Sequence, residues 1–370
     1  MRPFEDKIDR LLSVPPYAQS PEEKQASLLE IFKEQLNYGC ECHLGYKNFI
    51  EHWPGDYRNA THVADLPFLP VGILKTNPPL SFVNQDQIKR TLTSSATTSQ
   101  TPSRVVLDSP TARRMTKGVV SIVRDFIGSD RRPYLVVDTP GLQAGEEMGA
   151  RGAAIQGLQP FASETTHCLR LGEQGELQLE LDKIKSFAQG REDTELLVYG
   201  FTFILWNHLV KPLEAAGISF HLPKVRIFHS GGWKRLQDQA VEKSVFNDRL
   251  AQVFGTSPDR IVDFYGMVET VGVIYPDCPA GNKHGPVFGD VIVRDPLTLK
   301  PVAAGGRGIV QVCSVLPTSF PGHLLLTEDM AQVLAYDGCP CGRRGISFRF
   351  AGRIPKAELR GCGNLETKRS

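Results

Sequence analysis

Apolar residues recur at helical spacing near the start of the chain and predict two amphipathic helices, over residues 4–13 and 21–37. The second is preceded by Ser20-Pro21, a pair that commonly starts a helix. Residues 38–80 are rich in Pro, Gly, His and aromatic residues, so we expect an irregular stretch there. Another helix is expected over residues 111–126, after a loop rich in Ser and Thr and its short strand.

Strands and helices alternate in the middle of the chain. Short apolar runs predict buried strands at residues 134–137, 196–199 and 225–229. Helical patterns lie between and after them, at residues 175–188, 203–216 and 237–254. This alternation is typical of βαβ units, so it predicts an α/β fold with a largely parallel sheet.

The pattern changes after Gly285. Short strands separated by Gly and Pro turns are expected at residues 289–295, 308–315, 322–328 and 346–351. They predict an antiparallel sheet or small β-barrel. We therefore divide the chain into an N-terminal helical region (1–60), α/β subdomains (61–285), a barrel-like β subdomain (286–351) and a C-terminal tail (352–370).

Composition narrows the class of protein. A chain of 370 residues with 41% hydrophobic and 22% charged residues is ordinary for a globular protein with more than one subdomain. A net charge of +1 gives no electrostatic reason to expect nucleic acid or an anionic membrane as partner. The N-terminus has no apolar signal core, and the longest apolar run, near residues 201–206, is too short to span a bilayer. Eight cysteines then suggest reduced thiols, metal ligands or a nucleophile, and we expect a cytoplasmic protein.

Six of the eight residues from Thr91 to Thr98 are Ser or Thr. Hydroxyl-rich loops of this kind can bind polyphosphates through backbone N–H groups and hydroxyls, although for this run alone an ordinary polar loop is the simpler interpretation. It is not a Walker A loop, because residues 91–103 contain neither Gly nor Lys. It resembles the phosphate loop of adenylate-forming enzymes. Ser94, Ser95, Thr97 and Thr98 match that loop, and Ala96 and Ser99 replace its two glycines.

Two later segments follow in the order found in adenylate-forming enzymes. Gly231-Gly232 comes after a buried strand, and the resemblance implies that this turn lies against the adenine of ATP, since Gly permits close backbone approach. Tyr265-Gly266 followed by Glu269 resembles the Y-G-x-[ST]-E segment, with Val268 at the hydroxyl position. There the resemblance implies that the tyrosine stacks on adenine and that the glutamate holds Mg²⁺, a cation that prefers oxygen ligands.

Two shorter matches complete the nucleotide site. Residues 326–329 resemble the T-G-D segment, which implies that Asp329 binds the ribose hydroxyls, although Glu328 replaces the glycine. Residues 351–353 resemble the G-R-x-[DK] element at the hinge between the two domains of these enzymes. By that resemblance Arg353 reaches the ribose or phosphate, and Pro355 stands at the acidic or hinge position.

Residues 60–362 are similar to the acyl-protein synthetases of the bacterial bioluminescence fatty-acid reductase complex. The similarity includes residues 66–71, LPFLPV, and 229–234, HSGGWK, and an R-G-C ending at Cys362. It implies the large domain of an adenylate-forming enzyme, with parallel-sheet subdomains and a small barrel. The C-terminal mobile domain is expected to be missing, because the chain ends seventeen residues after Arg353.

The resemblance also implies a reaction. ATP converts a carboxylic acid, in that family a fatty acid, into acyl-AMP, and Cys362 then accepts the acyl group as a thioester. Two alternatives stay open. The acyl group could pass to coenzyme A or a carrier protein. Alternatively, the chain could be a catalytically weak scaffold for a reductase partner, since Ala96, Ser99 and Val268 depart from the motifs.

A second group of residues has the composition of a zinc site. Cys278, His284, Cys339 and Cys341 offer three thiolates and one imidazole, a ligand set found in structural zinc sites. The C-x-C spacing is tighter than usual, so free turn cysteines are an equal alternative. Residues 40–43, CECH, are interpreted as structural, and Cys313 and His323 as packing residues on strands.

Overall fold

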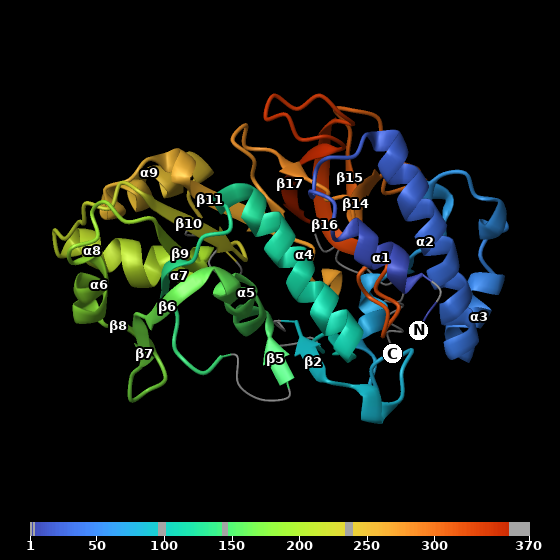
Figure 1. The fold of residues 1–370 in the computed structure, drawn as a ribbon, viewed down its shortest axis with the longest axis horizontal. Helices are drawn as coiled ribbons and strands as arrows, with labels where there is room; N and C mark the ends of the chain where they lie inside the picture. The colour runs from blue at the N-terminus through green and yellow to red at the C-terminus, as the bar shows by residue number, and fades with distance from the viewer. Residues whose placement is uncertain (1, 3, 95–100, 143–146, 234–239, 355–370) are drawn as a thin grey trace, which may run out of the picture.

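A six-stranded, mainly parallel sheet forms one lobe of the molecule, here called the parallel-sheet lobe (Figure 1). The computed structural model describes residues 2, 4–94, 101–142, 147–233 and 240–354. The strand order is β12-β11-β10-β9-β4-β6, and β12 alone is antiparallel to its neighbour. The strands are β4 (Arg132–Val136), β6 (Ala162–His167), β9 (Leu196–Phe201), β10 (Val225–Ser230), β11 (Ile261–Tyr265) and β12 (Tyr275–Pro276). The predicted parallel sheet is confirmed.

Helices pack around this sheet and close its core. They are α5 (Ala150–Leu158), α6 (Leu181–Ala188), α7 (Thr202–Leu205), α8 (Lys211–Ala215) and α9 (Lys243–Phe254), and a π-helix, η6 (Trp206–Val210), joins α7 to α8. The helix predicted over residues 175–188 is wrong in its first part, where β8 (Leu177–Leu179) pairs with β7 (Leu169–Leu171). Leu177 and Leu179 are two residues apart, which is the period of a strand.

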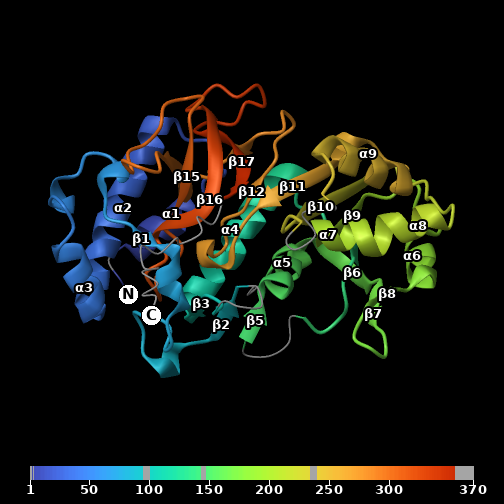
Figure 2. The same cartoon turned by 180° about the vertical axis from the view of Figure 1, so that it is seen from behind.

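An antiparallel sheet forms the second lobe, the antiparallel-sheet lobe (Figure 2). Its order across the described strands is β13-β17-β16-β15-β14. The bounds are β13 (Lys283–His284), β14 (Gly289–Arg294), β15 (Arg307–Ser314), β16 (Leu324–Ala335) and β17 (Ser347–Arg353). A short strand, β1 (Leu69–Pro70), adds to β16 in parallel. The antiparallel strands predicted after Gly285 are therefore present.

Three helices from the N-terminal part of the chain pack on the antiparallel-sheet lobe: α1 (Glu5–Leu11), α2 (Pro21–Cys42) and α3 (Leu44–Glu51). A capping box between Ser20 and Glu23 starts α2, as the Ser-Pro pair predicted. The irregular structure predicted from residue 38 is wrong up to Glu51. His43 ends α2 and caps α3, because its Nδ1 accepts a hydrogen bond from the Tyr46 amide at 3.1 Å.

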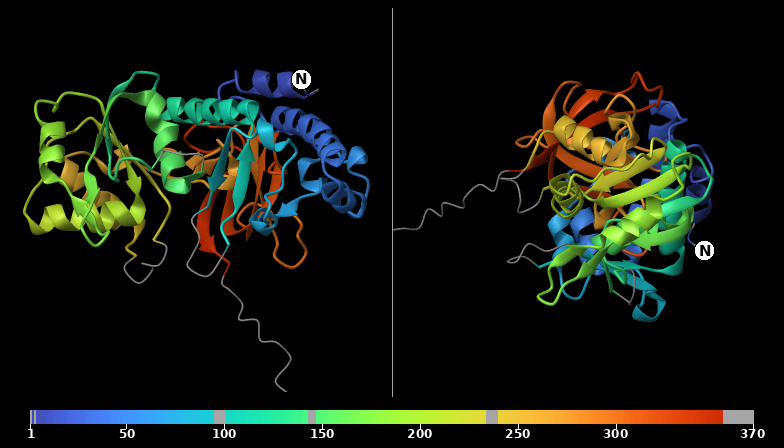
Figure 3. Two further views of the ribbon diagram at one scale, coloured as in Figure 1. Left: turned by 90° about the horizontal axis from the view of Figure 1, so that it is seen from below. Right: turned by 90° about the vertical axis from the view of Figure 1, so that its left-hand side faces the viewer.

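A small sheet lies between the lobes and holds both ends of the Ser/Thr-rich loop. In it β2 (Arg90–Thr93) pairs with β3 (Arg104–Leu107) and β5 (Glu147–Gly149). The long helix α4 (Ser109–Ile127) follows β3 and runs from one lobe to the other (Figure 3). Its Ile122 belongs to one apolar core, while Val119 and Val123 belong to the other. In the described part of the chain, no helix is long and apolar enough to cross a membrane.

Candidate active site

A hydrogen bond joins the two lobes at the predicted nucleotide site. Tyr265, the last residue of β11, donates its hydroxyl to Asp329 Oδ2 at 2.8 Å, and Asp329 lies on β16 of the other sheet. The fold thus brings together two predicted site residues that are 64 positions apart. Burial raises the pKa of Tyr265, and the nearby Asp329 carboxylate adds to that effect. The phenol therefore stays protonated and acts as a donor at neutral pH.

Aromatic rings surround Tyr265. Its ring stacks with Tyr275 at a centroid distance of 5.8 Å and with Phe350 at 5.1 Å. Phe350 lies on β17 and is 42% exposed, so this aromatic group is open to solvent at one edge. Phe350 belongs to none of the motifs, and the sequence analysis missed it. Exposed aromatic rings of this kind suit a planar ligand.

Asp329, which accepts the hydrogen bond from Tyr265, is buried. Burial raises the pKa of Asp329, while the hydrogen bond from Tyr265 opposes that shift. Arg353, at the end of β17, places its Nε 3.6 Å from Asp329 Oδ1 and is largely exposed. The structure therefore brings Arg353 to Asp329 as well, although the guanidinium is free to reach another anion. Glu328, the departure from the motif, is exposed.

Glu269 lies in a short 3-10 helix, η9 (Val268–Thr270), directly after β11. It is only 4% exposed, and its side chain is hydrogen-bonded to Ser103. Burial raises the pKa of Glu269. Among the described residues it forms no ion pair, so its negative charge is poorly compensated. A buried carboxylate without a paired cation is the kind of ligand that a Mg²⁺ ion would neutralise, and the residue therefore fits the predicted role.

The backbone beside Glu269 is held in an unusual conformation. Val271 has φ of 38°, a value that a β-branched residue rarely adopts. The Thr270 hydroxyl hydrogen-bonds to the carbonyls of Met267 and Val273, at 2.8 and 2.9 Å, and closes this turn on itself. Strained backbone held in place by its surroundings is common at functional sites.

The neck of the Ser/Thr-rich loop lies against Glu269. The Ser94 amide donates to the Ser103 carbonyl at 3.0 Å, and the Ser103 amide donates to Ser94 Oγ at 2.8 Å. Ser103 in turn contacts Glu269, so the loop leaves the sheet beside the candidate magnesium ligand. Ser103 was missed by motif matching, although it ends the hydroxyl-rich run. The other predicted hydroxyl residues, Ser95, Thr97 and Thr98, lie outside the described residues, as does Cys362.

The glycine turns stand at the carboxyl ends of neighbouring parallel strands, β10 and β11. Gly231 has φ of 87°, and a Cβ there would lie 2.1 Å from the Phe201 ring, so only glycine fits. Gly232 has φ of 56° and is exposed. Gly266 is also exposed. Ligands of parallel α/β sheets commonly bind outside this edge, next to the point where strand order reverses.

The four predicted zinc ligands come together. The donor atoms of Cys278, His284, Cys339 and Cys341 all lie within 4.8 Å of one another. Cys278 Sγ is 3.9 Å from Cys339 Sγ, and Cys341 Sγ is 3.4 Å from His284 Nε2. Three of the four residues are buried, and each of the seven described cysteines is free. Three thiols and an imidazole at one buried point match a closed tetrahedral zinc site, so the residues fit this metal.

Burial shifts the pKa values of two members of this cluster in opposite directions. Burial raises the pKa of Cys278 to about 12 and lowers the pKa of His284 to about 4. The imidazole is therefore neutral at physiological pH, as a zinc ligand must be. Asn282 Nδ2 donates to Cys339 Sγ at 3.5 Å, and the Arg343 amide donates to Cys341 Sγ at the same distance. Such donors orient and stabilise metal-bound thiolates.

The sequence analysis assigned the other cysteines and His323 to packing or structural roles. Cys313 and His323 are buried, and the His323 Nε2 lies 2.8 Å from the Tyr46 hydroxyl. Cys40 and Cys42 lie at the end of α2.

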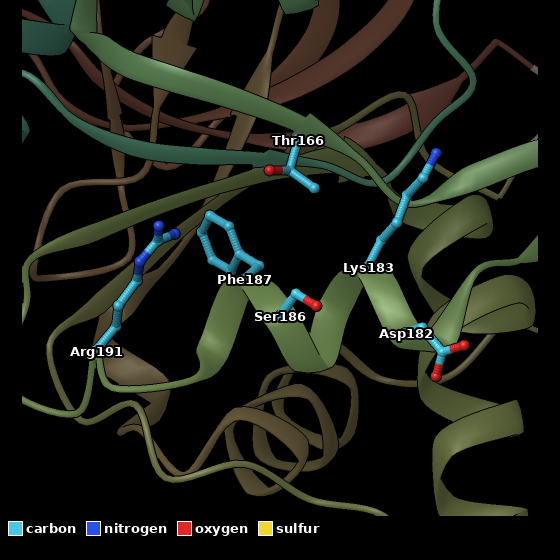
Figure 4. Close-up of a pocket in the computed structure, with 6 residues that line it drawn as sticks. All are labelled: Thr166, Asp182, Lys183, Ser186, Phe187 and Arg191. Atoms are coloured by element: carbon cyan, nitrogen blue, oxygen red, sulfur yellow. The ribbon is translucent and has the colours of Figure 1, made fainter.

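A separate small cavity of about 310 Å³ lies beside α6 (Figure 4). Its cations already have partners, because Lys183 contacts Glu180 at 2.6 Å and Arg191 contacts Glu164 at 2.5 Å.

Solved structures of known function resemble this fold. A 2-hydroxyisobutyryl-CoA ligase in complex with 2-HIB-AMP and CoA, in an open conformation, aligns with a TM-score of 0.66 and 16% identity, over 93% of this chain and 81% of that chain. The same ligase in its thioesterification state gives 0.65 and 17%, over 92% and 70%. These matches show that the chain shares the α/β fold of this CoA ligase, as predicted, whereas the small barrel and the missing C-terminal domain stay predictions.

Sequence comparisons point to one family. Long-chain-fatty-acid–luciferin-component ligases match at 30% identity over 37% of this chain and 35% of the Vibrio harveyi protein, and at 27% over 38% and 36% for Aliivibrio fischeri. The chain thus matches about a third of the length of these relatives. The family model described as "Acyl-protein synthetase, LuxE" matches residues 5–369, nearly the whole chain. The resemblance found in the sequence is confirmed, and the chain belongs to the LuxE acyl-protein synthetase family.

Proposed function

We propose that this protein uses ATP to activate a carboxylic acid and passes the acyl group to a thiol. The observation that carries the proposal is the meeting of Tyr265, Asp329 and Glu269 at the junction of the two lobes. Tyr265 and Glu269 belong to one motif of the adenylate-forming enzymes and Asp329 to another, and Glu269 lies beside the neck of the hydroxyl-rich loop.

The reaction has two balanced steps. A carboxylate oxygen of the acid attacks the α-phosphorus of ATP, and the bond to the β-phosphate oxygen breaks, which gives acyl-AMP and pyrophosphate. A thiolate then attacks the acyl carbon, and AMP leaves with the electron pair of the broken C–O bond. A carboxylate is a poor acyl donor, so activation splits one difficult transfer into two easier ones.

In this proposal each residue has a separate task. Asp329 binds the ribose hydroxyls, and its contact with Tyr265 fixes the orientation of both side chains. Tyr265 and Phe350 offer aromatic surface to the adenine. The glycines at 231, 232 and 266 admit the nucleotide close to the backbone, and Ser94, with the hydroxyls that follow it, contacts the phosphates. Arg353 supplies a cation at the ribose or phosphate.

Glu269 would hold Mg²⁺. When bound, the ion neutralises phosphate charge that develops as pyrophosphate leaves. The chain's contribution is a buried carboxylate held by Ser103 and by the closed turn at Thr270. Burial raises the pKa of Glu269, and a bound cation would oppose that shift by favouring the ionised carboxylate.

The acceptor thiol is proposed to be Cys362, with a fatty acid as substrate and an acyl reductase as the partner that consumes the product. The names of the relatives specify a long-chain fatty acid and a luciferin component, which supports this choice. Arg360, two positions before Cys362 in the sequence, is a cation of the kind that favours a thiolate. An ATP-dependent reaction on reduced thiols suits the cytoplasm, the compartment that we propose.

Acid-dependent exchange of labelled pyrophosphate into ATP tests the first step. We expect exchange with long-chain fatty acids and little with acetate, and no exchange with any acid would leave a scaffold role as the better account. Labelled acid with ATP should then give a protein-bound acyl group that hydroxylamine releases. If exchange occurs but label moves only to added coenzyme A or carrier protein, one of those acceptors replaces Cys362.

The Cys/His cluster is proposed to bind one structural Zn²⁺. Cys278 follows β12, His284 lies on β13, and Cys339 and Cys341 precede β17. One ion would therefore fasten the loop between the lobes to the edge of the antiparallel sheet. Structural zinc sites of this composition contribute directly to folding free energy.

A further inference from the structure

The segment after β1 carries a lysine to the edge of the candidate site. In the parallel pairing of β1 with β16, Leu69 lies opposite Leu325 and Pro70 opposite Leu326. The next element, the 3-10 helix η3 (Val71–Lys75), contacts β16, the strand that carries Glu328 and Asp329. Val71 and Leu74 are buried, so they anchor the helix from which Lys75 projects.

Lys75 lies within reach of two parts of the site. Its Nζ is 3.8 Å from Glu328 Oε1, the residue next to Asp329. Its charge also acts on Glu269, where it lowers the pKa of the carboxyl against the larger effect of burial. The Lys75 side chain is 30% exposed and so stays accessible to a ligand. The adjacent Thr76 Oγ1 is buried and has no hydrogen-bond partner among the described residues.

A polyphosphate at this site needs cations that its own loop does not supply. Residues 91–103 contain no Lys and no Arg. Phosphate oxygens form charge-assisted hydrogen bonds with Lys, which binds them as a point charge on a flexible stem. Because an exposed Lys–Glu pair stabilises the protein very little, Lys75 can leave Glu328 at small cost.

We propose that Lys75 binds the phosphates of ATP and exchanges its contact with Glu328 for phosphate oxygens when the nucleotide enters. The inference rests on the proposed ATP-dependent function and adds a residue that none of the matched motifs contains. Since η3 is fixed by β1 and by its buried side chains, the cation is in position before the ligand arrives.

Nucleotide binding by the full-length protein, measured by calorimetry without acid substrate, tests this role. Lys75→Met should weaken ATP binding by about tenfold to a hundredfold, because one charge-assisted contact is lost, and should leave adenosine binding unchanged. Lys75→Arg should recover most of the affinity. Glu328→Gln should bind ATP at least as tightly as wild type, because the competing carboxylate is gone.

Two variants serve as controls. Lys47→Met removes a lysine whose Nζ lies 3.7 Å from Glu51 Oε1 in an exposed pair on α3, and should bind ATP like wild type. Arg104→Met removes a charge near the loop, but Arg104 contacts Asn77 Oδ1, so its loss should be clearly smaller than that of Lys75→Met. Circular dichroism and melting temperature check that each variant is folded.

The outcomes separate the two proposals. If the wild type binds ATP and Lys75→Met binds it with the same affinity, the proposed role of Lys75 is wrong, while the proposed function still stands. An equal loss in Arg104→Met would do the same, because it would indicate a general electrostatic field rather than a contact. Equal loss of adenosine and ATP would mean that the variant damages the site as a whole. If wild type binds no ATP and shows no pyrophosphate exchange, the proposed function fails first.

Discussion

Glu269 is the residue on which the proposed chemistry depends most, because its carboxylate is buried without a paired cation among the described residues. Glu269→Gln removes the ligand charge but keeps the shape of the side chain. We expect pyrophosphate exchange to fall by about a hundredfold or more, since metal-mediated charge stabilisation contributes several kcal/mol. Glu328→Gln, an exposed neighbour of the site, should retain exchange. Normal exchange in folded Glu269→Gln would remove the magnesium assignment.

Glu269→Gln, which should lower activity, should raise the stability of the protein without nucleotide. Because burial raises the pKa of Glu269 in the folded state, the folded protein favours the protonated carboxyl. The carboxyl therefore stabilises the fold fully at pH values below its pKa in the unfolded chain. This stabilisation is lost as the pH rises through its pKa in the folded protein. At pH 7 without nucleotide, the neutral Gln should therefore raise the melting temperature by about 1–3 °C. An unchanged or lower melting temperature in apo Glu269→Gln would argue against a destabilised carboxylate.

A substitution of Cys362 should block the second half-reaction and leave the first unchanged. Cys362 belongs to none of the motifs proposed for acyl-AMP formation and follows all of them in the sequence. Cys362→Ser should exchange pyrophosphate at the wild-type rate but form no stable acyl-enzyme, because a serine hydroxyl is not appreciably ionised at neutral pH. Cys42→Ser, an exposed cysteine on α2, should behave like wild type in both assays. Acylation of Cys362→Ser at the normal rate would move the acceptor to another thiol.

Single residues were predictable where a motif fixes both identity and neighbours. Tyr265, Glu269 and Asp329 were selected in this way, and the structure places them near one another, while their roles stay predictions. Ser103, Phe350 and Lys75 were not selected, because their places beside the candidate site depend on strand register and packing between distant segments. Lys75 follows the LPFLPV segment that was noticed in the sequence, but only the pairing of β1 with β16 places it beside the site.

At the scale of elements, the Cys/His cluster should stabilise the loop before β13 and the turn before β17. We expect purified protein to contain about one equivalent of zinc, and Cys341→Ser to lose it and unfold at a lower temperature, since a structural ion contributes folding free energy. Cys40→Ser, also at a half-buried cysteine, should retain both zinc and stability. Wild-type protein without zinc, prepared without chelators, would end this proposal.

Most elements were predictable because their hydrophobic period is clear. The buried strand β9 has every residue buried and gives a continuous apolar run, and α4 shows a strong helical period. Short elements were less predictable. Leu177 and Leu179 have the period of a strand, but three residues are too few to decide the element without the hairpin that pairs them. The helix α3 forms where His43 caps it, a contact that periodicity does not reveal.

At the scale of the whole molecule, the Tyr265–Asp329 contact joins lobes with separate apolar cores. A ligand that binds there and not to the unfolded chain stabilises the fold by about 2.7 kcal/mol at 100 times its Kd. A non-hydrolysable acyl-AMP analogue should therefore raise the melting temperature of the wild type and merge any separate transitions of the lobes, because both lobes contact it.

The decisive comparison uses one residue from each lobe. Asp329→Asn should lose most of the stabilisation by the analogue, since a ribose ligand is removed, and Tyr265→Phe should lose part of it, since the hydroxyl that orients Asp329 is gone while the ring remains. Tyr336→Phe, which removes a hydroxyl just after the end of β16 that donates to the Val302 carbonyl, should respond like wild type. If the analogue stabilises all four proteins equally, the nucleotide binds away from the junction of the lobes, and the site proposed from Tyr265 and Asp329 is wrong.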